Sequence, residues 1–519
     1  MRILVYSQVN AAQIAHSLGV PEYSYYFVLR DFLPVLRQLG EVMVVEVPEL
    51  EVDKLYDEAT RQGKRCVFLA FSPPHKTPLS LRCPTIPVFA WEFDSIPDEH
   101  WLGEQHQDWS HVLRHCRQAI THSGLTVEAT RKVVGQAFPI ISIPSPVWDK
   151  YQTARSQHKA WDASMSVRIT IKSGVVLDTQ DVALEPYMPD LDAVGNAVKA
   201  AREREQVQQT LASVQAAAEE PCRRQSLWGI TRRYLGEWYL RAVREHLLGG
   251  AARSHGVGSA LEVVPEQQQE NMQPRNPVEP QHLPRHGLAP QPSEWELHAC
   301  HVDLSGVVFT TLFNPYDGRK NWVDMLTAFC AAFKDVSDAT LVFKLGHHEY
   351  QTALNDMLMC MARMPPFQCR VILLQGYMEG VEFERLIAAS TFVVNASHGE
   401  GQCLPLMEFL SCGKPAIAPM HSAMLDYIDE QIAFVVDSWL DASAWSHDPR
   451  LAYRTCRHQI NWASLVQAYS DAYSCAVHDP ERYATMSAAA IERMRNHCSI
   501  GVAAARMKAF LNTTDSVSQ

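Results

Sequence analysis

Short apolar runs separated by amphipathic stretches fill the first 150 residues of the chain. Runs of four to six apolar residues are typical of buried parallel strands, and the stretches between them carry the 3.6-residue period of helices. Alternation of this kind predicts a doubly wound α/β domain over residues 1–150, with ligands at the carboxyl ends of its strands. The predicted strands are 3–6, 42–47, 66–70 and 87–91, and the first helix is 25–39.

The same alternation returns in residues 301–455 and predicts a second α/β domain. Beyond residue 462 the pattern is helical almost to residue 511, so we expect residues 456–519 to form a C-terminal helical tail. The predicted strands of the second domain are 307–310, 339–344, 371–374, 392–394 and 416–418, and its predicted helices include 322–333 and 381–390.

Residues 151–300 break this pattern and are predicted to be an insertion between the two domains. The apolar runs 167–171 and 175–177 flank Lys172-Ser173-Gly174, which predicts a β-hairpin. Helices are predicted at 192–219 and 223–248. The proline- and glutamine-rich stretch 256–293 has the composition of a disordered linker.

The most informative stretch runs from Asn395 to Pro415 and predicts a strand end, a tight loop and a short helix. His398-Gly399-Glu400-Gly401 is loop chemistry, since two glycines can hold backbone conformations that other residues cannot. Pro405 suits the first turn of a helix and Gly413 suits its C-terminal cap. The helix N-terminus attracts an anion such as a diphosphate, while Glu400 and Glu408 on either side can accept hydrogen bonds from hydroxyl groups. A nucleotide sugar combines these features.

Glu400, Glu408 and the following Cys412-Gly413-Lys414-Pro415 resemble the Glu-x7-Glu signature of retaining glycosyltransferases of family 4, of the bacterial group 1 type. The resemblance covers residues 305–515 well and residues 1–150 loosely. It implies the GT-B fold, in which two Rossmann-like domains face a cleft and the last helices cross back to the first domain.

The implied activity is transfer of a hexose, with retention, from a nucleotide diphosphate sugar to a carbohydrate or lipid-linked hydroxyl. Cell-surface polysaccharide or glycoconjugate synthesis would be the setting. The resemblance implies neither a cofactor nor a metal ion. The family carries an aromatic residue and a glycine where this chain has Gln402-Cys403. That departure keeps open an alternative, a catalytically weak GT-B scaffold that binds a partner.

The resemblance assigns three residues to the catalytic centre. Glu400 corresponds to the glutamate that binds the transferred sugar, and Lys320 to the lysine that stabilises the departing diphosphate. The family arginine would fall near Pro315, so we expect the neighbouring Arg319 to supply the second cation. Arginine can fork onto phosphate oxygens and lysine acts as a point charge.

A second group is expected on the donor side. Glu408 corresponds to the glutamate that binds the ribose hydroxyls, and Tyr377 follows a strand where the nucleobase would lie. Lys344 ends a strand and could touch phosphate or sugar; the adjacent His347-His348 lack a third metal ligand. For Tyr377 a plain loop role stays open. The remaining donor-side candidates are Gly401, Gln402, Cys403, Leu404 and Asn314.

Four residues at strand ends of the first domain are candidates for the acceptor side. Glu92 and Asp94 could orient an acceptor hydroxyl, and Trp91 could be a platform for a sugar ring or simply a core residue. His122 follows the next strand. No histidine occupies the place where the family often has one.

Composition limits the alternatives. The net charge of −12 argues against a general nucleic-acid binder, and 47% hydrophobic with 20% charged residues describes a soluble globular protein. Thirteen cysteines without paired spacing predict reduced thiols and a cytoplasmic location. No membrane span is predicted. The amphipathic helix 223–248 could pack on a partner or touch the inner face of an anionic membrane.

Overall fold

The structure is a computed structural model that describes residues 1–9, 14, 19, 22–101, 103–156, 166–188, 195–196, 198–206, 299–378 and 380–513. The chain divides into two compact units, one of residues 1–188 and 287–519 and the other of residues 189–286. Of the helix predicted at 192–219, the described residues 195–196 and 198–206 are helical. The predicted helix 223–248 and the predicted linker 256–293 lie outside the described residues.

The N-terminal half of the first unit is a six-stranded parallel sheet with strand order β2-β1-β3-β4-β5-β6. The amphipathic α1 (Tyr23–Leu39) packs Val28, Phe32 and Leu36 onto it. The strands are β1 (Arg2–Ser7), β2 (Glu41–Val44), β3 (Cys66–Phe71), β4 (Thr85–Phe89), β5 (Ala119–Thr121) and β6 (Ile140–Ser142); the further helices are α2 (Pro48–Arg61), α3 (Trp109–Cys116), α4 (Gly124–Val134) and α5 (Gln152–Ser156).

The C-terminal half is a seven-stranded sheet with strand order β15-β14-β13-β10-β11-β12-β8. All neighbours pair in parallel except β8, which is antiparallel to β12. The strands are β8 (Gly174–Asp178), β10 (Val307–Phe313), β11 (Ala339–Leu345), β12 (Arg370–Gly376), β13 (Phe392–Val394), β14 (Ala416–Pro419) and β15 (Ala433–Val436); the helices are α9 (Trp322–Ala332), α10 (Gln351–Ala362), α11 (Val381–Ala389) and α12 (Leu404–Ser411).

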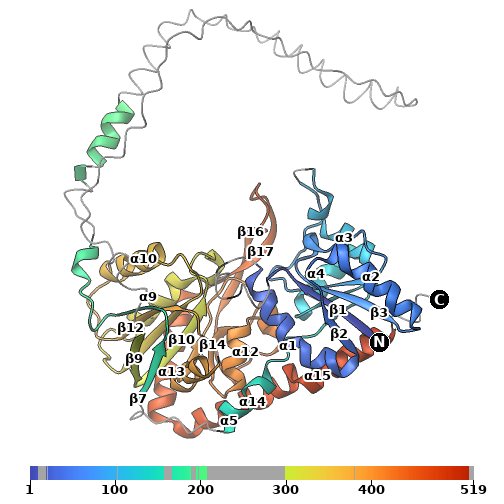
Figure 1. The fold of residues 1–519 in the computed structure, drawn as a ribbon. Helices are drawn as coiled ribbons and strands as arrows, with labels where there is room; N and C mark the ends of the chain where they lie inside the picture. The colour runs from blue at the N-terminus through green and yellow to red at the C-terminus, as the bar shows by residue number, and fades with distance from the viewer. Residues whose placement is uncertain are drawn as a thin grey trace, which may run out of the picture. The chain divides into compact units, whose positions relative to one another are not determined.

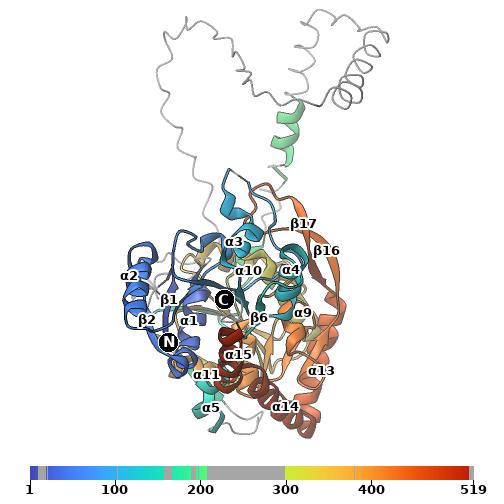
Figure 2. The same cartoon turned by 90° about the vertical axis from the view of Figure 1, so that its right-hand side faces the viewer.

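The last helices run from the second sheet back to the first (Figures 1 and 2). They are α13 (Trp462–His478), α14 (Pro480–Cys498) and α15 (Ile500–Thr513). Met494 of α14 packs in the core around α12, and Met507 of α15 packs in the core around α1. The expected α/β class, with two Rossmann-like halves and a C-terminal helical tail of the GT-B type, is confirmed.

The hairpin predicted between 167–171 and 175–177 is wrong. The strand β7 (Ser166–Ile171) pairs with β9 (Cys300–Ser305), whereas β8 joins the edge of the large sheet beside β12. A Cβ on Gly174 would lie 2.1 Å from the Gln375 carbonyl oxygen, so the missing side chain lets β8 approach β12 closely. The strand β8 therefore pairs with β12 at the edge of the large sheet, although the local sequence pattern predicts that it pairs with β7.

An antiparallel ribbon of β16 (Ser438–Ala444) and β17 (Tyr453–Ile460) was not predicted. In the sequence it lies between β15 and α13, and it is orange-red in Figure 1. Asp94 of the N-terminal half accepts hydrogen bonds from the Thr455 hydroxyl at 2.9 Å and the Cys456 amide at 3.0 Å. Trp445, between the strands, is buried in the N-terminal core. Much of the ribbon is exposed, so its sequence lacks the apolar alternation that marks a strand.

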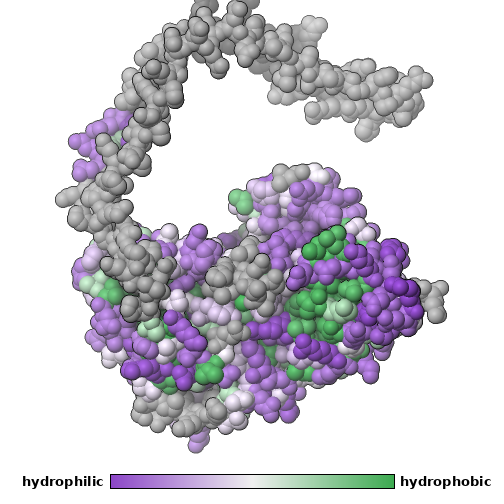
Figure 3. All heavy atoms as spheres, in the orientation of Figure 1, coloured by the Kyte–Doolittle hydropathy of each residue, from purple (hydrophilic) through white to green (hydrophobic). Residues whose placement is uncertain are grey.

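Hydrophilic side chains cover most of the described face drawn in Figure 3, with a hydrophobic area over the N-terminal half. Val44, Val47 and Leu50, where β2 passes into α2, are 61%, 45% and 62% exposed. Within the described ranges, no helix combines the length and the apolar character that crossing a bilayer requires.

The ion pair that fastens β8 to the sheet is the basis of a first prediction. Asp178 accepts from Arg370 at 2.5 Å, with both side chains largely buried. We expect Asp178→Ala to lower the free energy of unfolding by about 3 kcal/mol, because a buried guanidinium loses its partner. Urea unfolding followed by circular dichroism measures the change. The matched control Arg168→Ala breaks an exposed pair with Asp303 and should leave stability nearly unchanged.

Candidate active site

The loop between β13 and α12 carries a buried carboxylate. Glu400 is 3% exposed, and its Oε1 accepts hydrogen bonds from the Ser397 hydroxyl at 2.8 Å and the Asn395 amide at 3.1 Å. The glycine that follows allows close contact with the other half. A Cβ on Gly401 would lie 2.9 Å from the Cβ of Ala90, which follows β4. The loop therefore meets the carboxyl end of β4 without room for a side chain.

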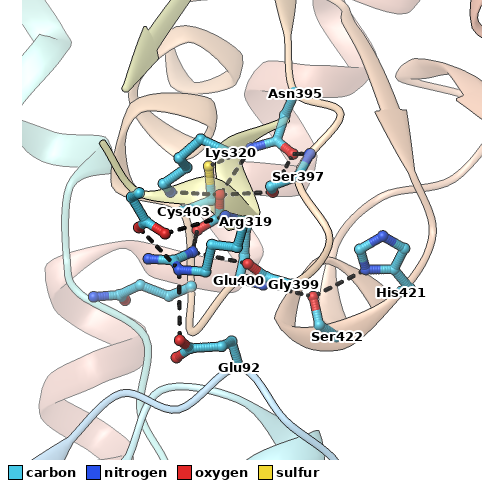
Figure 4. Close-up of polar contacts among 12 residues, drawn as sticks. Glu92, Arg319, Lys320, Asn395, Ser397, Gly399, Glu400, Cys403, His421 and Ser422 are labelled. Carbon is cyan, nitrogen blue, oxygen red and sulfur yellow. Dashed lines mark hydrogen bonds and ion pairs between the residues drawn. The ribbon is translucent and has the colours of Figure 1, made fainter. Parts of the chain in front are cut away.

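Two cations from the turn after β10 converge on this carboxylate (Figure 4). Lys320 Nζ lies 2.7 Å from Glu400 Oε1, and Arg319 Nη1 lies 3.1 Å from Glu400 Oε2 and 2.8 Å from the Gly399 carbonyl oxygen. The Arg319 carbonyl oxygen also accepts from the His398 amide at 2.7 Å. The turn and the loop come from neighbouring parallel strands, β10 and β13, whose carboxyl ends meet at one edge of the sheet.

A second carboxylate reaches the cluster from the N-terminal half (Figure 4). Glu92 Oε1 lies 3.4 Å from Arg319 Nε, and Asp317 Oδ2 lies 3.1 Å from the same atom. Three acids thus surround two cations. The structure brings together the three residues predicted to be catalytic, Glu400, Lys320 and Arg319, and adds Glu92 from the predicted acceptor side.

Burial and charge act in opposite directions on these groups. Burial raises the pKa of Glu400, but the charges of Lys320 and Arg319 outweigh it and hold the pKa well below its usual range. Burial raises the pKa of Glu92, with Arg319 opposing that rise. Arg319 is kept charged, because the three carboxylates raise its pKa although burial lowers it. At neutral pH Glu400 is therefore an ionised, acceptor-only group.

The two oxygens of Glu400 are used unequally. Oε1 accepts from Lys320, Ser397 and Asn395, whereas Oε2 accepts from Arg319. A carboxylate offers about four lone-pair sites, two on each oxygen. Oε2 is therefore the oxygen with capacity for a donor from a ligand, such as a hydroxyl group.

Strained backbone surrounds the Glu400 loop. Of the five described non-glycine residues with positive φ, Asn321 (53°), Cys403 (59°) and Ser422 (49°) each hydrogen-bond to a residue of the loop. Non-glycine residues in this region are uncommon, and such strain concentrates at functional sites. Sequence reasoning missed Asn321 and Ser422, because φ cannot be read from residue type alone.

Glu408 lies in a separate cluster. Its Oε1 accepts from Lys150 Nζ and from the Tyr151 hydroxyl, both at 2.7 Å, and no hydrogen bond joins it to the Glu400 cluster among the described residues. Asp31 of α1 is close enough for its charge to interact with those of Glu408 and Lys150. The predicted ribose-binding carboxylate is thus already paired, through Lys150 and Tyr151 of the segment after β6.

The residues that depart from the family pattern make contacts within the protein. The Gln402 carboxamide accepts from the Ser145 amide at 3.1 Å and donates to the Ser145 hydroxyl at 3.0 Å, which links the two halves. Cys403 holds the left-handed conformation at the N-cap of α12, and Leu404 begins the helix and packs against both adjoining cores. A predicted donor contact at Gln402 would compete with its bonds to Ser145.

The other donor-side candidates lie at neighbouring strand ends. Lys344 is buried and donates to the Leu345 carbonyl at 3.0 Å, and burial lowers its pKa to about 8. The Asn314 amide donates to the Gly19 carbonyl at 3.4 Å. Neither residue has a hydrogen bond to the Glu400 cluster among the described residues. Tyr377 follows β12, as expected.

Of the four acceptor-side candidates, only Glu92 reaches the cluster. Trp91 is 5% exposed, and its ring centroid lies 4.4 Å from that of Trp109. The structure therefore favours the interpretation of Trp91 as a core residue over its interpretation as a platform for a sugar ring. His122 is 1% exposed, its Nδ1 pairs with the Ile143 carbonyl at 2.9 Å, and burial lowers its pKa to about 4. Asp94 holds the β17 strand instead. No group of three or more His, Cys, Asp or Glu within the described ranges could hold a metal ion.

No protein-family model matches the chain, and no curated protein matches it. Among solved structures, it is similar to HepE of Anabaena in complex with UDP and glucose, with 10% identity over 98% of this chain and 99% of that chain and a TM-score of 0.44. It is also similar to sucrose-phosphate synthase of Thermosynechococcus elongatus, with 11% identity over 99% of each chain and a TM-score of 0.45. TarM gives 8% identity over 86% of this chain and 55% of that chain, with a TM-score of 0.42.

The charge balance around Glu400 yields a second prediction. We expect Glu400→Gln to lower the free energy of unfolding at pH 7 by about 3 kcal/mol, because Lys320 loses its carboxylate partner and Arg319 loses one of three. The folded pKa is depressed, so the contribution of Glu400 is present above the unfolded pKa of about 4.3 and is lost as the pH falls further. Urea unfolding between pH 7 and pH 3 tests whether the difference in unfolding free energy between the wild type and Glu400→Gln narrows only below about pH 4.3. Glu492→Gln, at an exposed pair, is the control.

The pKa of Asp31 is shifted in the opposite direction to that of Glu400, which gives a third prediction. Burial is the main cause that raises its pKa to about 6, although Lys150 and Arg30 oppose it. Between the unfolded value and pH 6 the folded state binds more protons, so stability falls as the pH rises through this window. Asp31→Asn should therefore raise the free energy of unfolding at pH 7.5 by about 2 kcal/mol and have little effect at pH 4. Equal effects at both pH values would contradict this, and exposed Asp335→Asn is the control.

Proposed function

We propose that the chain is a glycosyltransferase that moves a sugar from a nucleotide diphosphate sugar to a hydroxyl group. One observation carries the proposal: Lys320 and Arg319, from the end of β10, meet Glu400, from the end of β13, beside Glu92 of the other half. One cluster thus contains positive charge, which attracts a diphosphate, and a carboxylate that can accept a hydrogen bond from a hydroxyl group. The family resemblance assigns Glu400 and Lys320 to the same site, with Arg319 as the expected second cation.

The chemistry required of these residues is electrostatic. Negative charge develops on the departing diphosphate, and preorganised cations lower the barrier because they need not reorganise during the reaction. Arg319 and Lys320 would supply that charge, and Glu400 Oε2 would accept a hydroxyl of the transferred sugar. The resemblance implies a front-face mechanism in which the leaving phosphate takes the acceptor proton. Retention, a hexose as the transferred group and a carbohydrate or lipid-linked acceptor rest on that resemblance.

Donor binding would have to rearrange the charges. A diphosphate that enters beside Arg319 and Lys320 brings negative charge close to Glu92, Asp317 and Glu400. Glu92 has a pKa raised by burial and is therefore the carboxylate best placed to take up a proton when the donor binds. Proton uptake would remove the excess negative charge without displacing Glu400 from its hydrogen bonds.

A second candidate function is favoured by Gln402. Its carboxamide is engaged by Ser145, and the adjacent Gly401 lies against Ala90 and Trp91, so the loop expected to hold the diphosphate touches the other half directly. A weak GT-B scaffold that binds a partner would show such contacts. The two functions differ in one property, since only the enzyme consumes a nucleotide sugar.

Release of nucleotide diphosphate from UDP-, GDP- and dTDP-sugars tests the proposal. We expect turnover with at least one donor, and we expect Lys320→Met to lower kcat by roughly a hundredfold or more, because a cation that stabilises the leaving group is lost. The control is Lys334→Met, which removes an exposed lysine outside the cluster. A wild-type protein that binds none of these donors and releases no nucleoside diphosphate would support the second candidate function, a scaffold that binds a partner.

A further inference from the structure

The segment that follows β14 makes hydrogen bonds to the backbone of Glu400. The Glu400 amide donates to the Ser422 hydroxyl oxygen at 3.0 Å, and the Glu400 carbonyl oxygen accepts from the Ala423 amide at 3.1 Å. Two consecutive residues thus fix both polar backbone groups of Glu400. The side chain of Glu400 faces Lys320 and Arg319, away from this support (Figure 4).

Ser422 makes this contact at a conformational cost. Its φ is 49°, in the left-handed region that favours glycine, yet the residue is serine and is 2% exposed. A glycine there would relieve the strain but would have no hydroxyl. Strain of this kind persists only where surrounding contacts determine the conformation. What serine supplies at this position, and glycine would not, is therefore the hydroxyl group and its hydrogen bond.

The ring of His421 lies beside that hydroxyl. Its Nδ1 lies 3.1 Å from Ser422 Oγ, and burial, with His458 next to it, lowers the pKa of His421 to about 3. In the neutral tautomer that carries its proton on Nε2, the ring accepts the Ser422 proton at Nδ1, which leaves the lone pairs of Oγ for the Glu400 amide. The ring itself is fixed by stacking on His458 of β17, with centroids 4.1 Å apart and planes 13° apart.

We propose that Ser422 is a positioning residue for Glu400, and that His421 fixes the direction of the Ser422 hydroxyl. The chain of hydrogen bonds runs from the Glu400 amide to Ser422 and on to His421 (Figure 4). It holds the main chain of the loop while Lys320 and Arg319 hold the carboxylate. The catalytic part of this inference rests on the proposed function; the structural part, that Ser422 fixes the Glu400 backbone, does not.

Residue-resolved hydrogen–deuterium exchange tests the structural part without substrate. We expect Ser422→Ala and Ser422→Gly to speed exchange of the Glu400 amide by roughly tenfold, because its acceptor is lost. His421→Phe, which keeps a ring against His458 but removes Nδ1, should act in the same direction. The matched control is Ser464→Ala, which removes a hydroxyl that accepts from the Asp437 amide at 3.0 Å. Unchanged exchange at Glu400 in both Ser422 variants would overturn the proposal.

Kinetics with a donor that the wild-type protein consumes test the catalytic part. Ser422→Ala and Ser422→Gly should both lower kcat roughly tenfold or more with KM within about threefold, since misplacement of a reacting group is costly. Ser422→Gly should also melt at a higher temperature than Ser422→Ala, because it relieves the positive φ. A fully active Ser422→Gly would overturn the positioning role. A wild-type protein without turnover would instead refute the proposed function, and the exchange experiment would still decide the role of Ser422.

Discussion

The buried charge of Glu400 is the interaction on which the rest of the candidate site depends. An ionised carboxylate that is 3% exposed is stable only if cations and hydrogen-bond donors replace the lost water. Lys320 and Arg319 supply the charge, and Ser397 and Asn395 supply further donors. Because these residues come from two parallel strands, the site exists only when β10 and β13 are neighbours in the sheet.

The same cluster joins the two halves of the first unit. Arg319 pairs with Glu92, Gln402 bonds to Ser145, and the glycines of the loop lie against the end of β4. The ribbon of β16 and β17 adds another link, since β17 is bonded to Asp94 on one side and to the His398 carbonyl on the other. Any displacement of one half relative to the other is therefore coupled to the surroundings of Glu400.

Strain and support complement one another around the loop. Asn321, Cys403 and Ser422 adopt left-handed conformations that the local sequence does not favour, and each makes a hydrogen bond to the loop. The seven-stranded sheet and its helices supply the packing that holds these conformations. Folding of the large core and placement of the carboxylate are thus parts of one structure, in which the site is maintained by contacts made far from it in sequence.

The sequence by itself determined the two α/β halves and the helical tail, and its resemblance to a known family predicted that Glu400 lies near Lys320 and Arg319. Apolar runs specify buried strands, and parallel strands bring their carboxyl ends to one edge. It could not determine that Glu408 is paired with Lys150 and Tyr151, that Trp91 and His122 belong to the core, or that β8 joins the edge of the large sheet. Those outcomes depend on which side chains from distant segments compete for the same contact, and only the tertiary structure decides that competition.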